Sequence, residues 1–157
     1  MTHQNNDDQR LKQLVANWIN GTNTFEDVQY LEEGVKSKLR RASNSILRKF
    51  YSIVLQTKVH MISSEKNEEK ITNEILTSLY RTYIMSKYEL GRSKKSNDDM
   101  GDKGLRWLSQ IMEYGIVEME RISKDTTEVA TLNRAFQNFT KIMEAIVAFH
   151  KLYGEKK

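Results

Sequence analysis

Apolar residues recur along the chain with the three- and four-residue spacing of amphipathic helices. Near the N-terminus this spacing predicts a short helix over residues 10–20 that ends at Gly21, after a polar start at residues 1–9 that is expected to be disordered. A second short helix is predicted after Thr24, where an acid three residues later resembles a capping box, and Gly34 is its expected end.

Four longer helices are predicted after these two. They cover residues 37–62, 69–91, 103–122 and 125–153, and the charged, glycine-terminated segment 92–101 is expected to be an exposed loop. This loop joins two helices and does not divide the chain, because neither side has a full apolar core of its own. The chain is therefore expected to be one all-α domain, a compact bundle of about four to five main helices.

The second of the long helices has more apolar surface than one stripe. Tyr80, Ile84 and Tyr88 widen this surface, so we expect the helix to be buried on two sides. The last helix also has a broad apolar arc, and the excess indicates an oligomer or a larger assembly. The two tyrosines, Trp107 and Tyr114 could stack on bases, but such residues more often belong to a core or a subunit interface.

Composition supports the helical prediction and narrows the class of protein. The 157 residues include no proline and 7 glycines, so helix breakers are few. The absence of cysteine excludes disulfides, zinc–thiolate sites and thiol nucleophiles. No apolar run approaches the ~20 residues that span a bilayer, and the polar, acidic N-terminus is unlike a signal peptide. We therefore expect a cytoplasmic protein that does not enter a membrane.

Positive charge is concentrated in one segment. The formal net charge is +4, from 25 basic and 21 acidic residues, yet Val35–Ser64 contains no aspartate or glutamate. The basic residues of this segment are Lys36, Lys38, Arg40, Arg41, Arg48, Lys49 and Lys58. All of the excess positive charge therefore comes from this segment, and the rest of the chain is net acidic.

These cations fall on one side of the first long predicted helix. Lys38, Arg41, Arg48 and Lys49 lie opposite its apolar face, and Arg40 lies at the boundary. A row of cations along a helix can follow a phosphate backbone without reading bases. Such a face can also be solvated or dock on a protein, although a solvated helix normally mixes charges of both signs. The spacing alone leaves both interpretations open.

Catalytic and metal-binding motifs are not recognisable in the sequence. His3 lies in the polar start, and neither His60 nor His150 has an acid at the spacing of a carboxylate–histidine metal pair. Glycine-rich phosphate loops and nucleophile elbows are absent as well. We therefore predict no catalytic residue, no metal and no cofactor. An enzyme built on a helical bundle is the least favoured class.

Three segments together resemble a known family. They are Ser37–Arg41, Tyr88–Arg92 and Phe139–Tyr153, in that order along the chain. Their order and spacing are similar to the small helical subunit of the type III-A CRISPR–Cas (Csm) effector complex. As a layout, the resemblance covers about residues 34–154. Lys36 departs from the family pattern, which usually has threonine there, and the N-terminal segment and the loop after the second motif look longer than usual.

The resemblance implies a subunit that contacts RNA and does not cleave it. Small subunits of this family line up in several copies beside the subunits that hold the CRISPR RNA, and basic residues contact the path of the guide and target RNA. The implied partners are CRISPR RNA, target RNA, other Csm subunits and copies of the same chain. Lys38, Arg40, Arg41 and Arg92 match the family motifs, whereas Arg48 and Lys49 come from the basic row alone. These six residues are the expected RNA-binding set.

A second function is consistent with the same residues. The chain can be a helical adaptor whose basic row docks on an acidic protein surface, with no RNA bound. The salt dependence of RNA binding distinguishes the two functions, because several phosphate contacts give a steep loss of affinity with salt.

Overall fold

The computed structural model describes residues 2–93 and 99–154. Within them the chain forms six α-helices and no β-strand. The helices are α1 (Thr2–Ile19), α2 (Phe25–Lys38), α3 (Asn44–Asn67), α4 (Asn73–Ser93), α5 (Asp99–Asp125) and α6 (Val129–Tyr153). The all-α prediction is confirmed, and the number of helices in this part of the chain is slightly higher than expected.

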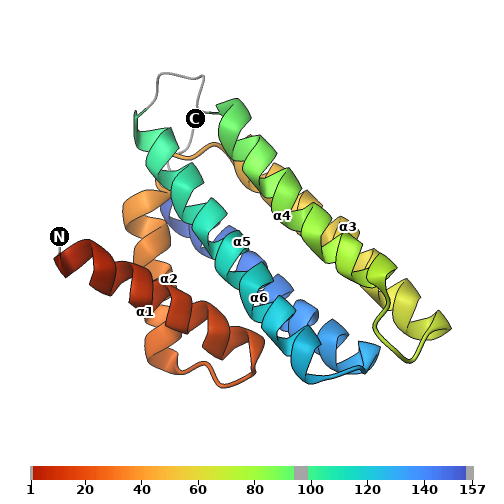
Figure 1. The fold of residues 1–157 in the computed structure, drawn as a ribbon. Helices are drawn as coiled ribbons and strands as arrows, with labels where there is room; N and C mark the ends of the chain where they lie inside the picture. The colour runs from red at the N-terminus through yellow and green to blue at the C-terminus, as the bar shows by residue number, and fades with distance from the viewer. Residues whose placement is uncertain (1, 94–98, 155–157) are drawn as a thin grey trace.

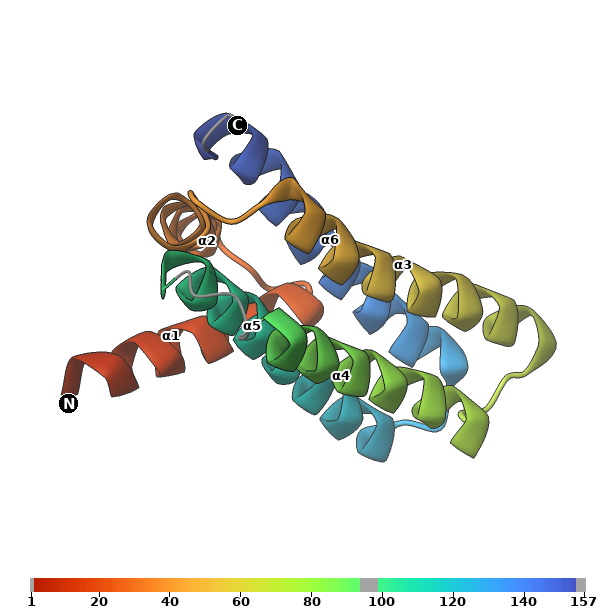
Figure 2. The ribbon, with the colours of Figure 1, turned by 90° about the horizontal axis from the view of Figure 1, so that it is seen from above.

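Helices α3 to α6 form an antiparallel bundle (Figure 1). The chain runs alternately up and down, and each helix of the four packs against two others, with α3 and α6 closing the ring. Helices α1 and α2 lie across the outer side of α5 and α6, where the view from above shows α2 nearly end-on (Figure 2). Short connections explain this topology, since they force consecutive helices to run antiparallel.

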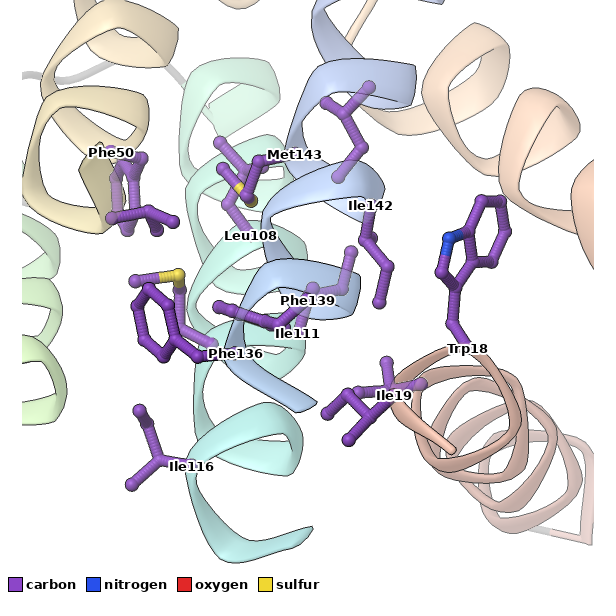
Figure 3. Close-up of a cluster of buried hydrophobic side chains, with 14 of the residues drawn as sticks. Trp18, Ile19, Phe50, Leu108, Ile111, Ile116, Phe136, Phe139, Ile142 and Met143 are labelled. Atoms are coloured by element: carbon purple, nitrogen blue, oxygen red, sulfur yellow. The ribbon is translucent and has the colours of Figure 1, made fainter. Parts of the chain in front are cut away.

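The core is centred on α6. Phe136 and Phe139 are fully buried, and their rings meet edge to face with centroids 6.1 Å apart. Figure 3 shows Phe50 of α3 on one side of α6, and Trp18 on the other. Burying a large apolar side chain stabilises the fold by roughly 1.5–3 kcal/mol. Consequently α6 holds both the bundle and the N-terminal helices in place.

The N-terminal helices begin and end largely where their residues indicate. Gly21 has a φ of 73°, the left-handed conformation that favours glycine at the end of a helix. The predicted capping box at the start of α2 is also confirmed. The Thr24 side chain accepts a hydrogen bond from the backbone N–H of Asp27, and the Asp27 carboxylate accepts one from the backbone N–H of Thr24.

The predicted disorder of residues 1–9 disagrees with the start of α1, which begins at Thr2. Side chains at positions 7 and 10 of α1 contact α2. Arg10 forms an ion pair with buried Asp27 and lies 5.0 Å from the centre of the Tyr30 ring. The Tyr30 hydroxyl donates to Asp7 at 3.5 Å. The sequence pattern within residues 1–9 does not reveal these partners.

Gly34 does not end α2, contrary to the prediction. The helix continues through it to Lys38, and Gly34 instead faces the indole of Trp107 on α5. A Cβ atom at Gly34 would overlap that ring. The glycine is therefore needed for close packing of α2 on α5, which brings buried Trp107 into the core.

At one end of the bundle, the α3–α4 connection pairs with the α5–α6 connection. The backbone N–H of Ile71 donates to the carbonyl of Thr127 at 2.8 Å, and that of Val129 donates to Glu69 at 2.9 Å. The last helix starts later than predicted, and the predicted capping box is not formed. Its N-cap is Glu128, whose side chain makes no capping hydrogen bond. The Glu69 carbonyl satisfies the N–H of Val129, one of the first-turn donors that have no partner within the helix.

The predicted loop over 92–101 is shorter than expected. Its first two residues belong to α4 and its last three to α5, while residues 94–98 lie outside the described part of the chain. The α5 helix thus starts four residues before the predicted position and also ends later, at Asp125.

Candidate nucleic-acid interface

The helix predicted over residues 37–62 does not start at residue 37, because residues 37 and 38 belong to the end of the preceding helix. The α2 helix ends at Lys38, and α3 begins only at Asn44. Arg40 and Arg41 lie in the turn between them, and Arg48 and Lys49 lie on the early turns of α3. The prediction of one basic row along a single helix is therefore wrong.

Burial and capping cause the break. The turn buries Leu39 and Ala42, which pack into the core from a position that a continuous helix would not provide. Ser43 then caps α3, since its hydroxyl accepts a hydrogen bond from the backbone N–H of Ile46 at 3.2 Å. The run Ser43-Asn44-Ser45 is the sequence signal for this break, because such residues favour caps and turns over helix interiors.

Two further contacts fix the turn to the bundle. The Nε2–H group of buried His150, on the last turn of α6, donates to the carbonyl oxygen of Ala42 at 3.0 Å. On α5, a Cβ atom at Gly104 would lie 2.8 Å from the carbonyl oxygen of Lys38, so the glycine permits a close approach. The backbone that carries Arg40 and Arg41 is thus held by α5 and α6 together.

The expected RNA-binding residues come from three parts of the chain but lie toward one end of the bundle. At this end α2 finishes, α3 begins and α4 finishes (Figure 1). We call it the basic end and define it by Lys38, Arg40, Arg41, Arg48, Lys49 and Arg92, all of which are exposed. Arg92 also lies 3.9 Å from the carboxylate of Glu89, an exposed pair of small energetic value.

The antiparallel topology adds cations that the sequence pattern did not single out. Lys103 and Arg106 lie on the first turns of α5, and Lys151 lies on the last turn of α6. The start of α5 and the end of α6 both lie at the basic end. The Lys36 ammonium lies 5.7 Å from the centre of the Tyr153 ring, which brings α2 beside the end of α6. No local spacing reveals this grouping, because it depends on how the helices pack.

The opposite end of the bundle is acidic. Segments 65–74 and 118–128 lie there and contain eight acids and four bases. Arg121 is tied to acids of its own helix, Glu118 at 2.5 Å and Asp125 at 3.0 Å. Burial raises the pKa of Glu118, but hydrogen bonds from Arg121 and Asn20 outweigh it, so the pKa lies below its ordinary value. These two segments therefore carry more negative than positive charge, whereas cations gather at the basic end.

The structure corrects the expectation that α4 is buried on two sides. Tyr80, Ile84 and Tyr88 are exposed, with 38%, 62% and 60% of their surface accessible. Their four-residue spacing puts them on one side of the helix, which we call the α4 face. Trp107 is buried in the core, the location favoured over base stacking by its residue type, and Tyr114 is half-buried against the core.

Within residues 2–93 and 99–154, no group of three or more histidine, aspartate or glutamate side chains is placed to hold a metal ion. His60 lies on α3 and its Nε2 atom is buried without a hydrogen-bond partner. In the same part of the chain, no helix is long and apolar enough to cross a membrane.

The fold and surface define a small all-helical bundle protein with one basic end. The family model described as Csm2 Type III-A matches residues 22–156. The chain therefore belongs to the Csm2 family, and it is a small subunit of a type III-A CRISPR–Cas effector complex that associates with other Csm subunits. No curated protein matches the chain, and no solved structure does either.

Proposed function

We propose that this subunit contacts the backbone of the guide and target RNA through its basic end and carries no catalytic activity. The observation that supports this role is the gathering of Lys38, Arg40, Arg41, Arg48, Lys49 and Arg92 at one end of the bundle from three separate elements. Phosphate contacts of this kind are electrostatic and independent of sequence. Base pairing with the guide supplies specificity, and this subunit steadies the backbone.

The acidic opposite end supports one orientation. RNA phosphates are repelled by segments 65–74 and 118–128, so the basic end faces the RNA and the acidic end points away from it. The α4 face is the proposed contact with other Csm subunits or with copies of the same chain. It exposes large apolar side chains in a continuous row, as subunit interfaces do.

Charge reversal in the assembled complex tests the RNA contact. Arg48→Glu combined with Lys49→Glu should weaken target-RNA capture and reduce the slope of log K against log salt by about two, one for each lost phosphate contact. Lys66→Glu is the matched control, because Lys66 is exposed on the last turn of the same helix at the acidic end.

Three outcomes are informative. A lower slope with the double variant and an unchanged slope with the control support the proposal. Equal slopes for the wild-type and doubly reversed complexes contradict it. Loss of subunit incorporation with unchanged RNA binding by the remaining complex favours the adaptor function, in which the basic end docks on an acidic protein surface.

A further inference from the structure

A groove lies between α3 and α6 beside the basic end. Its volume is about 510 Å³, and most of its wall is apolar. Leu47, Tyr51 and Leu55 line it from α3, and Val147 lines it from α6. This groove adjoins the basic end, because Arg48 lines the groove and also belongs to the basic end.

Polar groups stand at defined places around this apolar wall. Arg48 and Lys151 place cations at its rim from opposite helices. Glu144 also lines the groove, and its carboxylate accepts a hydrogen bond from the Tyr51 hydroxyl at 3.5 Å. Buried His150 lies at the groove and connects it to the Arg40–Arg41 turn through the carbonyl of Ala42.

The chemistry of the groove matches a nucleotide. A base has flat apolar faces, which suit the aliphatic wall and the Tyr51 ring. Cytosine, adenine and guanine have an amino group at their edge, which a carboxylate such as Glu144 accepts. The attached phosphates suit Arg48 and Lys151. An acidic peptide would suit the two cations as well, but its carboxylates would meet Glu144 within the same groove.

We infer that the groove between α3 and α6 binds one unpaired nucleobase of the RNA whose backbone lies on the basic end. Glu144 accepts a hydrogen bond from the amino group of the base, and Arg48 and Lys151 hold its flanking phosphates. This inference rests on the proposed function, because the RNA must reach the basic end. The proposed function involves contacts to the RNA backbone alone, and this inference adds a contact to a base.

The test is a titration of the ¹⁵N-labelled full-length chain at low salt, followed by NMR. The probes are a cytidine hexamer, a uridine hexamer and an abasic hexamer with the same number of phosphates. We expect amide signals of Leu47, Tyr51 and Val147 to shift with the cytidine hexamer but not with the abasic one. Cytidine should bind roughly tenfold more tightly than the abasic hexamer, a usual effect of stacking a base on an aromatic ring.

Two tryptophan variants separate the groove from its surroundings, and a third variant tests the hydrogen bond to the base. Ser52→Trp fills the groove from an exposed position on α3 and should abolish the preference for bases. Ala148→Trp introduces the same ring at an exposed position of α6 that does not line the groove, and it should bind like the wild type. The wild type should also prefer cytidine over uridine, because uracil has no amino group for the Glu144 carboxylate to accept from. Glu144→Gln should erase this preference, because its amide can accept from the cytosine amino group and can also donate to the uracil carbonyl.

The outcomes distinguish the two proposals. Shifts at the basic end alone, equal for all three hexamers, overturn the base-binding inference and leave the RNA contact standing. Groove signals that respond to a purified Csm subunit and to none of the hexamers overturn the inference in favour of a protein occupant. The proposed RNA contact is decided separately, by the salt slope of the assembled complex.

Discussion

His150 and Ala42 are 108 residues apart in the sequence, yet the imidazole Nε2–H donates to the Ala42 carbonyl at 3.0 Å. Both residues are buried. The bond ties the last turn of α6 to the turn that carries Arg40 and Arg41. The position of these two cations therefore depends on packing at the C-terminal end of the chain.

Replacing the imidazole tests this dependence. His150→Leu leaves the Ala42 carbonyl buried without a donor, so we expect a loss of about 1–3 kcal/mol in the free energy of unfolding, measured by urea denaturation. His150→Gln can still donate and should lose less. Equal stability of wild type and His150→Leu would show that the bond does not hold the turn.

Asp27 has a pKa below its ordinary value. Burial of the carboxylate raises the pKa, but hydrogen bonds from the Thr24 backbone and from the side chains of Arg10 and Asn17 outweigh that effect. A carboxylate whose pKa is lowered on folding stabilises the protein above its unfolded pKa of about 3.9. This stability is lost as the pH falls through the lower pKa of the folded state.

Asp27→Asn should therefore destabilise the protein in a pH-dependent way. At neutral pH we expect a loss of about 1–3 kcal/mol, because asparagine is a weaker acceptor and leaves the Arg10 guanidinium without its charged partner. The difference from wild type should shrink as the pH falls below about 4, because the unfolded chain then binds a proton at Asp27 that the folded protein takes up only at lower pH. Urea denaturation at a series of pH values measures this difference. A difference that stays constant down to acid pH would contradict the assignment.

Gly115 on α5 is a position where close packing requires glycine. A Cβ atom there would overlap the buried ring of Phe139. Gly115→Ala should therefore lower the free energy of unfolding by about 1–3 kcal/mol, the usual cost of overpacking a core. Thermal or urea denaturation measures this loss.

Gly91 is the matched control for Gly115. It also lies within a helix, but nothing stands within 4 Å of the place where its Cβ atom would be. Gly91→Ala should raise stability by about 0.5–1 kcal/mol, because alanine loses less backbone freedom in a helix. A result in which both alanine variants change stability in the same direction would contradict the packing described for α5 and α6.

The α4 face should matter for assembly and not for folding. Ile84→Lys combined with Tyr88→Lys alters exposed side chains, so the isolated chain should keep its stability within about 0.5 kcal/mol for each change. Incorporation into the effector complex, measured by co-purification with other Csm subunits, should fall sharply. Val117→Lys, at an exposed apolar position on α5, is the control. Full incorporation of the double variant would exclude the α4 face as an interface.

Local residue types predicted much of the fold. The spacing of apolar residues placed most of the helices, and Gly21 and the Thr24 capping box marked two ends because a short motif determines each of them. The prediction that Gly34 ends α2 was wrong, because glycine occurs both at helix ends and where two helices pack closely. Only the position of Trp107 shows that Gly34 has the second role.

The basic site was predicted less completely than the fold. The acid-free segment gave five of its six defining cations, and the sixth, Arg92, came from the family resemblance. The break between Lys38 and Asn44 was missed because its only local signal is the run Ser43-Asn44-Ser45, without glycine or proline, and because tertiary burial of Leu39 and Ala42 stabilises it. Lys151 and Arg106 join the site only through antiparallel packing, which a single sequence pattern does not contain.

Photo-crosslinking of the assembled effector complex to target RNA, followed by mass spectrometry of the peptides, tests the central claim most directly. We predict RNA adducts on peptides from segments 36–52 and 144–153, at and beside the basic end, and none on segments 65–74 and 118–128. Adducts on the acidic end alone, or no adduct on this subunit while other subunits crosslink, would contradict the claim that the basic end contacts RNA.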